Sequence, residues 1–445
     1  MAGFLHRKKH FTSFQIIILG FTVVILTGSL LLMLPVSSRT GQVTPFSDAL
    51  FTSVSAVCVT GLVVQDTATY WSIFGQSVIL LLIQTGGLGV VTVIASFALL
   101  SGKKISLMQR STMQEAIAAP GVGGIVRLTN FILKGTFAIE FAGAMIMLPV
   151  FCRDFGLRGI WMAFFHSISA FCNAGFDILG TTNAPYASLT AYTKSPVINL
   201  TVMSLIIVGG IGFLTWDDIR THKLRLKKYK MQSKVILVTT AALILLPAIF
   251  FYFAEFSTLP FKERFFGSLF QSVTPRTAGF NTLDLGKITS AGQAVMIALM
   301  LVGGSPGSTA GGMKTTTLAV LLANALAVFR RKEDAQLFGR RIEENAIRNA
   351  STVLMMYITL FFGGALIINA AEGLPLRVCL FETASAAGTV GLTLGVTPGL
   401  GLLSRYVLIL LMFFGRVGGL TLIFAALSRT SKNLSRLPQG RITVG

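Results

Sequence analysis

The chain has 445 residues, of which 53% are hydrophobic and only 12% charged, and its mean hydropathy is +0.74. A soluble domain typically carries about twice that share of charged residues, so the composition excludes a soluble protein for most of the chain. The formal net charge of +20 would suit nucleic-acid binding, but the charges are distributed in a way that argues against it.

Charge-poor stretches long enough to cross a bilayer recur along the chain, and each such helix needs about 20 apolar residues. In chain order they are residues 11–38, 67–102, 135–152, 195–216, 235–254, 288–313 continuing to 329, 349–371 and 402–428. Glu140 lies in the third, and Arg405 and Arg416 interrupt the last. The first is too long for the apolar core of a signal peptide and does not end at a small-residue cleavage site. The sequence therefore predicts an all-α integral membrane protein with eight transmembrane helices.

Most lysines and arginines lie in segments on the same side of the membrane as the amino terminus, with the largest groups in residues 220–234 and 330–348. An excess of basic residues marks cytoplasmic loops, so topology accounts for the net charge. We expect a multi-pass protein of the cytoplasmic membrane with both termini cytoplasmic. It would be surrounded by the lipid bilayer and would bind no nucleic acid.

The outer connections repeat one pattern four times. They read FTSVSAVCVTGL, FHSISAFCNAGF, LFQSVTPRTAGF and FETASAAGTVGL, each a short apolar segment followed by a turn with one glycine. The glycines are Gly61, Gly175, Gly279 and Gly391, and a large apolar residue stands ten positions before each. Self-similarity at a nearly constant spacing indicates a repeat architecture.

Each repeat is predicted to contain a helix, a short re-entrant pore helix, the glycine turn and a second helix. The repeats cover residues 1–128, 129–234, 235–348 and 349–445. Because each repeat crosses the membrane twice, all four are parallel. They can then surround a central pore and bring the four turns together.

The glycine turns have the properties of an ion filter. Backbone outside a helix at membrane depth is tolerated only where it lines a cavity or is buried in protein. Backbone carbonyls can replace the hydration shell of potassium, and glycine supplies the φ > 0 conformations that align them. One turn alone would suit an ordinary loop, whereas four in register favour a filter. The residues expected to present carbonyls to potassium, the transported ligand, are Val59, Thr60, Gly61, Asn173, Ala174, Gly175, Thr277, Ala278, Gly279, Thr389, Val390 and Gly391.

Acidic residues follow three of the turns: Asp66 and Asp284 five positions after their glycines, and Asp177 two positions after its own. A pore mouth of one charge sign raises the local concentration of cations. We expect these three carboxylates at the outer mouth. No tightly bound cofactor is predicted, and the four cysteines show no metal-ligand spacing.

The repeats resemble those of the Ktr/Trk/HKT superfamily of potassium transporters. The segments VCVTGL, SAFCNAGF and RTAGFNT are most similar to the membrane (B) subunit of the bacterial Ktr potassium uptake system, and the resemblance covers essentially the whole chain. It implies gated potassium uptake by the pore-forming subunit of a homodimer, regulated by a cytoplasmic ring of nucleotide-binding subunits. Relative to the TVGYG signature of potassium channels, each repeat lacks the Tyr-Gly pair, which leaves the strictness of potassium selection open.

Each second helix carries a glycine pair, and the third pair begins an unusual segment. Gly86-Gly87, Gly209-Gly210 and Gly418-Gly419 are expected to allow close helix packing. Residues 303–312 read GGSPGSTAGG, and in a helix each Gly costs about 1 kcal/mol and Pro about 3 relative to Ala. We predict a loop that divides the helix into residues 288–302 and 313–329. The resemblance implies that it is a gate, formed by Gly303, Gly304, Gly307, Ser308, Thr309, Ala310, Gly311, Gly312 and Arg416.

Four polar residues stand at apolar positions. Arg416 lies within the last crossing, where a basic residue normally faces a cavity or a partner. The resemblance places it against the gate, and the alternative is a structural contact with a helix-end carbonyl. Glu140 is expected to make a structural hydrogen bond, His166 to be packed, and Arg276 to pair with a carboxylate such as Glu382.

An intramembrane enzyme is the competing class of function, but it would need convergent catalytic groups. The chain offers only Glu140, Arg416 and four scattered histidines, so we predict no enzyme. A sodium uniporter or a sodium/potassium symporter on the same scaffold stays open. A membrane potential of 100 mV can concentrate any monovalent cation about 50-fold without coupling.

Overall fold

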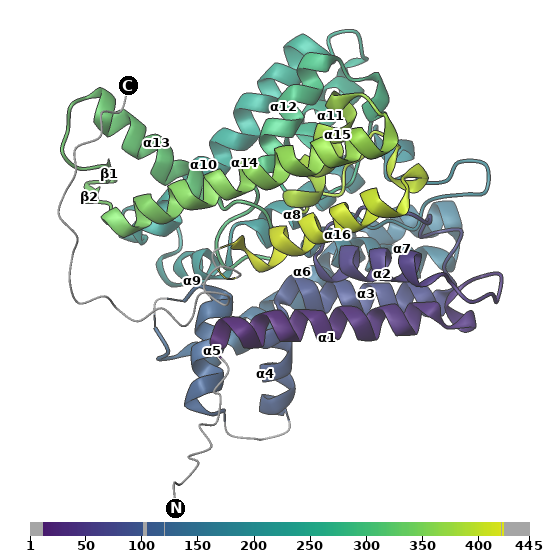
Figure 1. Ribbon diagram of the computed structural model, residues 1–445, viewed down its shortest axis with the longest axis horizontal. Helices are drawn as coiled ribbons and strands as arrows, with labels where there is room; N and C mark the ends of the chain where they lie inside the picture. The colour runs from purple at the N-terminus through teal and green to yellow at the C-terminus, as the bar shows by residue number, and fades with distance from the viewer. Residues whose placement is uncertain (1–11, 101–104, 120, 420, 422–445) are drawn as a thin grey trace, which may run out of the picture.

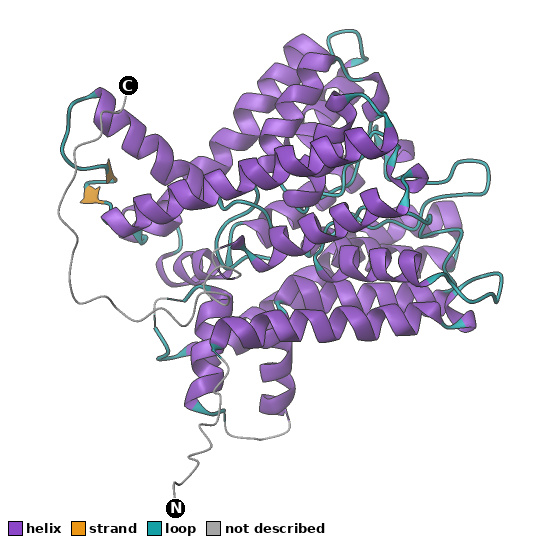
Figure 2. Cartoon of the chain, in the orientation of Figure 1, coloured by secondary structure: helices purple, strands orange, loops and turns teal. Residues whose placement is uncertain are grey.

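The computed structural model describes residues 12–100, 105–119, 121–419 and 421. Within these residues the secondary structure is helical apart from one hairpin of two-residue strands, β1 (Gln336–Leu337) and β2 (Arg340–Arg341) (Figure 2). The predicted all-α class is therefore confirmed for the described part of the chain.

Four long helices form the frame of the molecule. Among the described residues they are the unbroken helices long and apolar enough to cross a membrane. They are α1 (Ser13–Met33), α6 (Ile125–Phe155), α10 (Met231–Phe250, continued by a π-helical turn over Phe251–Glu255) and α14 (Glu344–Glu372). Each coincides with the predicted first helix of a repeat, and α1 and α14 run in the same direction across Figure 1.

Four short helices follow the long ones, and each packs against the long helix before it. They are α2 (Phe46–Val57), α7 (Arg158–Phe171), α11 (Phe261–Val273) and α15 (Leu376–Ala387). With 12 to 14 residues each, they are shorter than a bilayer crossing requires. Each ends one or a few residues before a glycine turn.

The second helices are broken, which differs from the continuous stretches predicted for residues 67–102, 195–216 and 402–428. The segments are α3 (Ile73–Leu88) with α4 (Val90–Leu100), α8 (Pro196–Gly210) with α9 (Phe213–His222), α12 (Ser290–Leu301) with α13 (Thr315–Phe329), and α16 (Leu402–Val417). Gly89, Gly212 and Gly418 stand at the breaks with φ of 86°, 91° and 87°, which a continuing helix does not allow. The bend between α8 and α9 is 97°. Residues beyond 421 in the last stretch lie outside the described part.

The packing order of the helices closes on itself. The second helix of each repeat packs against the short helix of the next: α3 on α7, α8 on α11, α12 on α15, and α16 back on α2. This arrangement surrounds the point at which the four short helices end. It therefore determines where the glycine turns meet.

Additional elements lie at the ends of the long helices. Helix α5 (Leu107–Ile117) packs against α1, α4 and α6, and together with α9 and the hairpin it lies at the left of Figure 1. Short 3₁₀ turns cover Pro35–Ser37, Thr190–Tyr192, Leu226–Lys228, Leu285–Lys287 and Thr397–Gly399.

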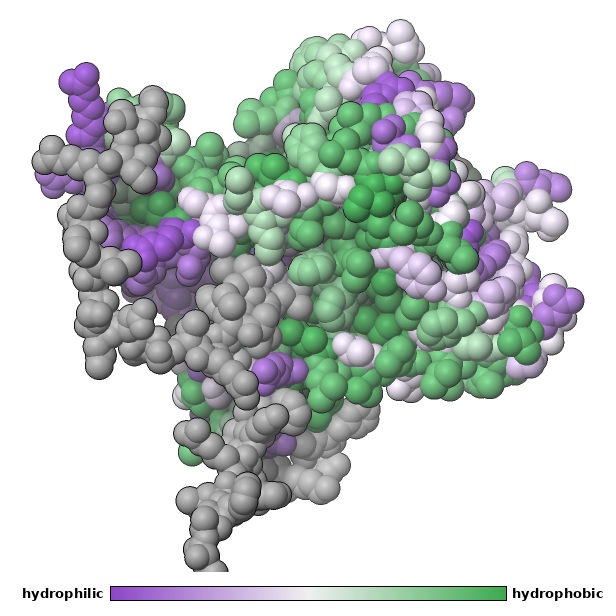
Figure 3. Space-filling view, in the orientation of Figure 1, coloured by the Kyte–Doolittle hydropathy of each residue, from purple (hydrophilic) through white to green (hydrophobic). Residues whose placement is uncertain are grey.

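The outer surface carries an apolar band. Figure 3 shows hydrophobic residues over α1, α14 and α16, with hydrophilic residues gathered toward the two ends. Leu30, Leu81 and Leu246 are 62%, 68% and 68% exposed, which is costly in water and suits contact with lipid. The described surface therefore supports a multi-pass membrane protein.

Candidate functional site: four glycine turns and the loop beside them

The four glycine turns share one backbone conformation. In each turn the first predicted filter residue and the glycine have positive φ, and the residue between them does not. The angles are 49° and 91° at Val59 and Gly61, 57° and 69° at Asn173 and Gly175, 60° and 80° at Thr277 and Gly279, and 51° and 94° at Thr389 and Gly391. Three of the four non-glycine positions are β-branched, for which positive φ is an outlier that the surroundings must impose.

The turns also meet one another in cyclic order. A Cβ on Gly61 would lie 2.5 Å from the carbonyl oxygen of Ala174, and a Cβ on Gly175 would lie 2.8 Å from that of Ala278. A Cβ on Gly279 would likewise collide with the carbonyl oxygen of Val390, and a Cβ on Gly391 with the carbonyl oxygen of Thr60. The backbone of each turn thus approaches the next too closely for any side chain. The carbonyls of four chain segments are gathered at one place, as the coordination of a bare cation requires.

Hydroxyl groups at the ends of the short helices fasten the turns. Ser55 and Ser385 accept hydrogen bonds from the N–H groups of Gly61 and Gly391 at 3.1 and 3.0 Å. Ser169 and Thr274 instead donate to the carbonyl oxygen of the residue after the glycine in their own turns. These four residues were not among the predicted site residues. The serine six positions before the glycine in three of the four repeats was the sequence signal that could have identified them.

A cavity of about 250 Å³ opens on one side of the four turns, and all four glycines line it. Asp66 and Asp177, two of the three carboxylates expected at the outer mouth, also line it. Asp66 accepts hydrogen bonds from the N–H groups of Thr69 and Tyr186, both at 2.8 Å. Burial raises the pKa of Asp177 to about 7, with the nearby charge of Asp66 adding to the shift. A cation in this cavity would favour the charged form of both carboxyl groups.

Asp284, the third residue predicted at the mouth, does not line this cavity. Its carboxylate accepts a hydrogen bond from the N–H of Gly286 at 3.0 Å and pairs with Lys287 at 3.6 Å. It therefore caps the 3₁₀ turn Leu285–Lys287 at the surface, where its side chain is 59% exposed.

The glycine-rich loop (residues 303–312) is non-helical, as predicted, and hydrogen-bonded to several repeats. Ser305 N–H donates to Gly210 O at 3.0 Å, and Gly312 N–H donates to Gly415 O at 3.1 Å. The Thr309 hydroxyl contacts Phe171 O and Asn173 Oδ1 at 3.0 and 2.9 Å. The loop thus lies directly beside the second glycine turn and joins three repeats.

Two basic side chains, Lys314 and Arg416, donate hydrogen bonds to carbonyl oxygens in and around this loop. Lys314 Nζ donates to Ala310 O at 2.9 Å. The Arg416 guanidinium donates to Thr309 O in the loop and to Gly86 O and Gly87 O at the end of α3, the last at 3.1 Å. None of the ion pairs within the described residues includes Arg416. Both arrangements considered for Arg416 are therefore present, since it contacts the loop and also helix-end carbonyls.

Close contacts between helix glycines and the carbonyls of the turns show which residues of the second helices are equivalent in the different repeats. A Cβ on Gly86, Gly209 or Gly415 would collide with the carbonyl of the residue four positions before the glycine of its own turn. The fourth counterpart of Gly86-Gly87 is therefore Gly415-Arg416, and the predicted pairing with Gly418-Gly419 was wrong by three residues. Gly418 corresponds instead to the helix-ending Gly89. Arg416 thus occupies the place that Gly87 and Gly210 hold in the first two repeats.

The remaining predicted polar residues have clear roles. Glu140 is 4% exposed and accepts a hydrogen bond from Gln84 Nε2 at 3.2 Å, as expected. His166 is fully buried, with Nδ1 2.7 Å from Met162 O, which also agrees with the prediction.

The pairing of Arg276 with Glu382 was wrong. Arg276 instead contacts Thr240 Oγ1 at 3.3 Å, from the neighbouring long helix. Glu382 is occupied by its own repeat, because it accepts hydrogen bonds from Thr393, Leu394 and Thr397 at 2.6 to 2.9 Å. It therefore fixes the chain just after the fourth glycine turn.

Known proteins resemble this chain over nearly its full length. A family model described as TrkH, cation transport protein, matches residues 6–436. The potassium/sodium uptake protein NtpJ of Enterococcus hirae is 41% identical over 435 residues, covering 96% of this chain and 95% of that protein. The Ktr system potassium uptake protein B of Bacillus subtilis is 37% identical over 442 residues, covering 98% and 97%. The crystal structure of the potassium transporter TrkH from Vibrio parahaemolyticus shares the fold, with a TM-score of 0.74 at 20% identity, covering 95% of this chain and 86% of that one.

Proposed function

The chain belongs to the TrkH family of cation transport proteins and to the Ktr/Trk superfamily, and on that premise we propose that it takes up potassium through the four glycine turns. Uptake runs across the cytoplasmic membrane, with four parallel repeats around one pore and eight crossings, four of them broken. Both termini are cytoplasmic.

The observation that carries this proposal is the repeated backbone of the turns. Eight residues with positive φ, two in every turn, hold the carbonyls of four segments around one point. Carbonyl oxygens in such a ring substitute for the water that potassium loses on entering.

The glycine-rich loop and Arg416 are proposed as the closed gate. The loop is hydrogen-bonded beside Asn173 of the second turn. Arg416, which makes no ion pair with any residue that the structure describes, places a positive charge against it. A like charge repels a permeating cation, by about 4 kcal/mol at 4 Å for an effective dielectric constant near 20. The barrier is thus both steric and electrostatic.

The test is ion-replacement uptake in cells that lack other potassium uptake systems. Cells expressing the chain should take up potassium or rubidium with saturation at low external concentration, and an excess of sodium should compete weakly. Equal uptake of sodium in the absence of potassium would contradict a potassium pathway.

A sodium-carrying role is the second candidate, because the relative from Enterococcus hirae is named a potassium/sodium uptake protein. A uniporter would carry sodium alone. A symporter would show potassium uptake that rises with external sodium, with both ions entering at a fixed ratio. Simultaneous tracer uptake of the two ions distinguishes these cases.

The regulatory partner is proposed to be a cytoplasmic ring of nucleotide-binding subunits beneath a homodimer. Support comes from the name of the Bacillus subtilis relative, which assigns it to a multi-part Ktr system. The β1–β2 hairpin turns at Phe338-Gly339, both with positive φ as in a type I′ turn, and exposes Arg340 and Arg341.

Reversal of both charges, Arg340→Glu with Arg341→Glu, should weaken capture of the ring in a pull-down without reducing membrane insertion. The matched control is Arg153→Glu with Lys194→Glu, whose exposed ion pairs lie at the opposite end of the long helices and contribute little. Unchanged capture by the hairpin variant would contradict docking at this surface.

A further inference from the structure

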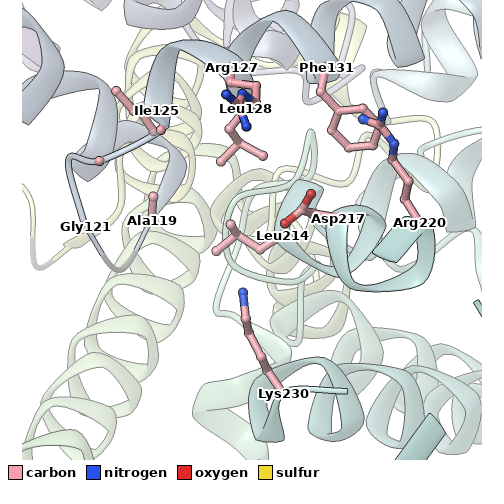
Figure 4. A pocket seen from close by; sticks show the side chains of 12 residues that line it. Ala119, Gly121, Ile125, Arg127, Leu128, Phe131, Leu214, Asp217, Arg220 and Lys230 are labelled. Atoms are coloured by element: carbon pink, nitrogen blue, oxygen red, sulfur yellow. The ribbon is translucent and has the colours of Figure 1, made fainter. Parts of the chain in front are cut away.

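A cavity of about 680 Å³, which shares no lining residue with the cavity at the glycine turns, lies between the start of α6, helix α9 and the residue before α10 (Figure 4). Three basic side chains from these three elements line it: Arg127, Arg220 and Lys230. Asp217 is the one acidic residue in the lining, so the cavity carries a net positive charge. None of the predicted filter, gate or mouth residues lines it.

Two of the basic groups are not used in ion pairs or hydrogen bonds within the described part of the chain. Among the described residues, no ion pair within 4.0 Å and no hydrogen bond involves the guanidinium of Arg127 or Arg220. Figure 4 shows the Arg220 side chain against the Phe131 ring. Its guanidinium carbon lies 4.8 Å from the ring centre. Stacking on an aromatic face holds a guanidinium in place and leaves its in-plane N–H groups free for a phosphate.

The start of α6 adds to the positive field. Its first turn contains Arg127 and no acidic residue, and Gly124 at the N-cap position provides no side-chain cap. Free N–H groups at a helix N-terminus favour an anion. The basic cluster and the helix start therefore point to the same ligand charge.

Apolar side chains line the same cavity, interleaved with the basic ones on α6 and α9 (Figure 4). Ile125, Leu128, Phe131 and Leu214 line it. Less than two turns further along α6, Phe137 is 57% exposed on the surface that suits lipid. A ligand with a charged phosphate and an apolar body fits this combination better than a free anion does.

We propose that this cavity binds the phosphate-bearing headgroup of an anionic phospholipid, held by Arg127, Arg220 and Lys230. Asp217 narrows the choice, because its carboxylate repels a free phosphate dianion but accepts a hydrogen bond from a hydroxyl group on the headgroup. Phosphatidylglycerol, with one phosphodiester charge and two hydroxyl donors, meets both demands. The site does not depend on which ion the protein transports.

The test uses the purified full chain in detergent, titrated with dioctanoyl phosphatidylglycerol, dioctanoyl phosphatidylcholine or inorganic phosphate. Binding is counted as lipid adducts by native mass spectrometry and as a rise in melting temperature. The phosphatidylglycerol form should bind about tenfold more tightly than the phosphatidylcholine form, because only the first adds net negative charge near the basic residues. Inorganic phosphate at the same concentration should neither bind nor compete.

Three variants distinguish a specific lipid site in the cavity from nonspecific electrostatic attraction of the lipid to the basic surface. Arg127→Gln with Arg220→Gln should reduce affinity about 30-fold, the combined effect of two basic residues near an anionic headgroup. Lys227→Gln with Lys228→Gln removes the same charge from neighbouring exposed positions outside the cavity, and should change affinity less than about twofold at physiological salt. Arg220→Lys keeps the charge but loses the planar fork, and should bind more weakly than the parent chain.

Equal losses in the two double variants would overturn the site in favour of general charge attraction. Competition by inorganic phosphate would overturn the lipid assignment in favour of a soluble anion. If the Arg127/Arg220 variant fails to elute as a folded species, Arg220→Lys decides alone, and parent-like binding by it contradicts the proposal. None of these experiments measures potassium uptake. A negative result for lipid binding therefore does not bear on the proposed transport function.

Discussion

The glycine turns and the helix ends beside them belong to the same repeats, yet they repeat to different degrees. In the turns, the same two positions have positive φ in all four copies, and each glycine faces the carbonyl of the next copy. At the helix ends, the first two repeats carry Gly87 and Gly210, the third carries the glycine-rich loop, and the fourth carries Arg416.

The difference follows from what each region has to do in the proposed transport. A cation is coordinated from all sides, so every repeat must supply the same backbone geometry. A barrier needs to block the path only once, so one loop and one charge suffice. Mutations should therefore have similar effects across the four turns and repeat-specific effects at the helix ends.

The largest effect is expected from replacing the turn glycines with serine, one at a time. Each variant should lose about tenfold or more in potassium uptake affinity, because left-handed backbone alone costs a non-glycine residue about 1–2 kcal/mol and each Cβ also meets a carbonyl. Gly175 should be the most tolerant, since its Cβ would have the longest approach, 2.8 Å. Concentration-dependent rubidium uptake measures the affinity.

Gly395→Ser is the matched control for those variants. Gly395 has φ of 89° but nothing within 4 Å of its Cβ position, so it shares the strain without the collision. It should change affinity far less. A loss as large as that of Gly391→Ser would mean that strain, rather than contact between repeats, governs the turns.

The second prediction concerns Arg416. Arg416→Ser removes the positive charge beside the glycine-rich loop and should raise potassium flux per folded protein about tenfold, because charge repulsion of this kind is worth up to about 4 kcal/mol. Arg405→Ser, on the same helix, removes an arginine paired with Asp48 at 2.7 Å and should not raise flux. If Arg416→Ser lowers only the amount of folded protein, Arg416 has a packing role and the gate is wrong.

A smaller increase is expected from Thr309→Val. The substitution keeps the shape of the side chain and removes its one hydroxyl proton, which is donated to either Phe171 O or Asn173 Oδ1 in a hydrogen bond worth about 0.5–1.5 kcal/mol. Loosening the loop should raise uptake without the ring by about threefold. Ser308→Ala is the control, since its hydroxyl bonds only within the loop, to Ser305 O. Equal uptake by both variants would show that the Thr309 contacts do not hold the loop closed.

The smallest expected effects are on stability, and they differ between the adjacent glycines Gly209 and Gly210. Gly209→Ala should destabilise the protein by about 1–3 kcal/mol, because its Cβ would collide with Phe171 O. At Gly210 the nearest atom would be 3.7 Å away, and alanine is the better helix former by about 1 kcal/mol, so Gly210→Ala should leave the melting temperature unchanged or slightly higher. A drop for both would contradict the assignment of Gly209 as the close-contact position.

The sequence by itself predicted the long helices, the four turns and the glycine-rich loop. Long apolar segments have one stable form in lipid, because only a helix satisfies the backbone internally. The loop could be predicted because glycine and proline disfavour a helix through local terms that no neighbour removes. Position in the repeat was also enough to identify Gly61 and its three counterparts.

Only the tertiary structure decided the breaks in the second helices, the partner of Arg276 and the true counterpart of Arg416. A single glycine such as Gly89 suits both a continuous helix and a left-handed break, and only the structure, with φ of 86° there, shows that the helix breaks. Glu382 lay within reach of Arg276 by sequence pattern, but its oxygens are occupied by hydroxyl and N–H groups of its own repeat. The partner of a buried polar group depends on which distant segments of the chain lie next to it. Those neighbours are determined only when the four repeats pack around their common centre.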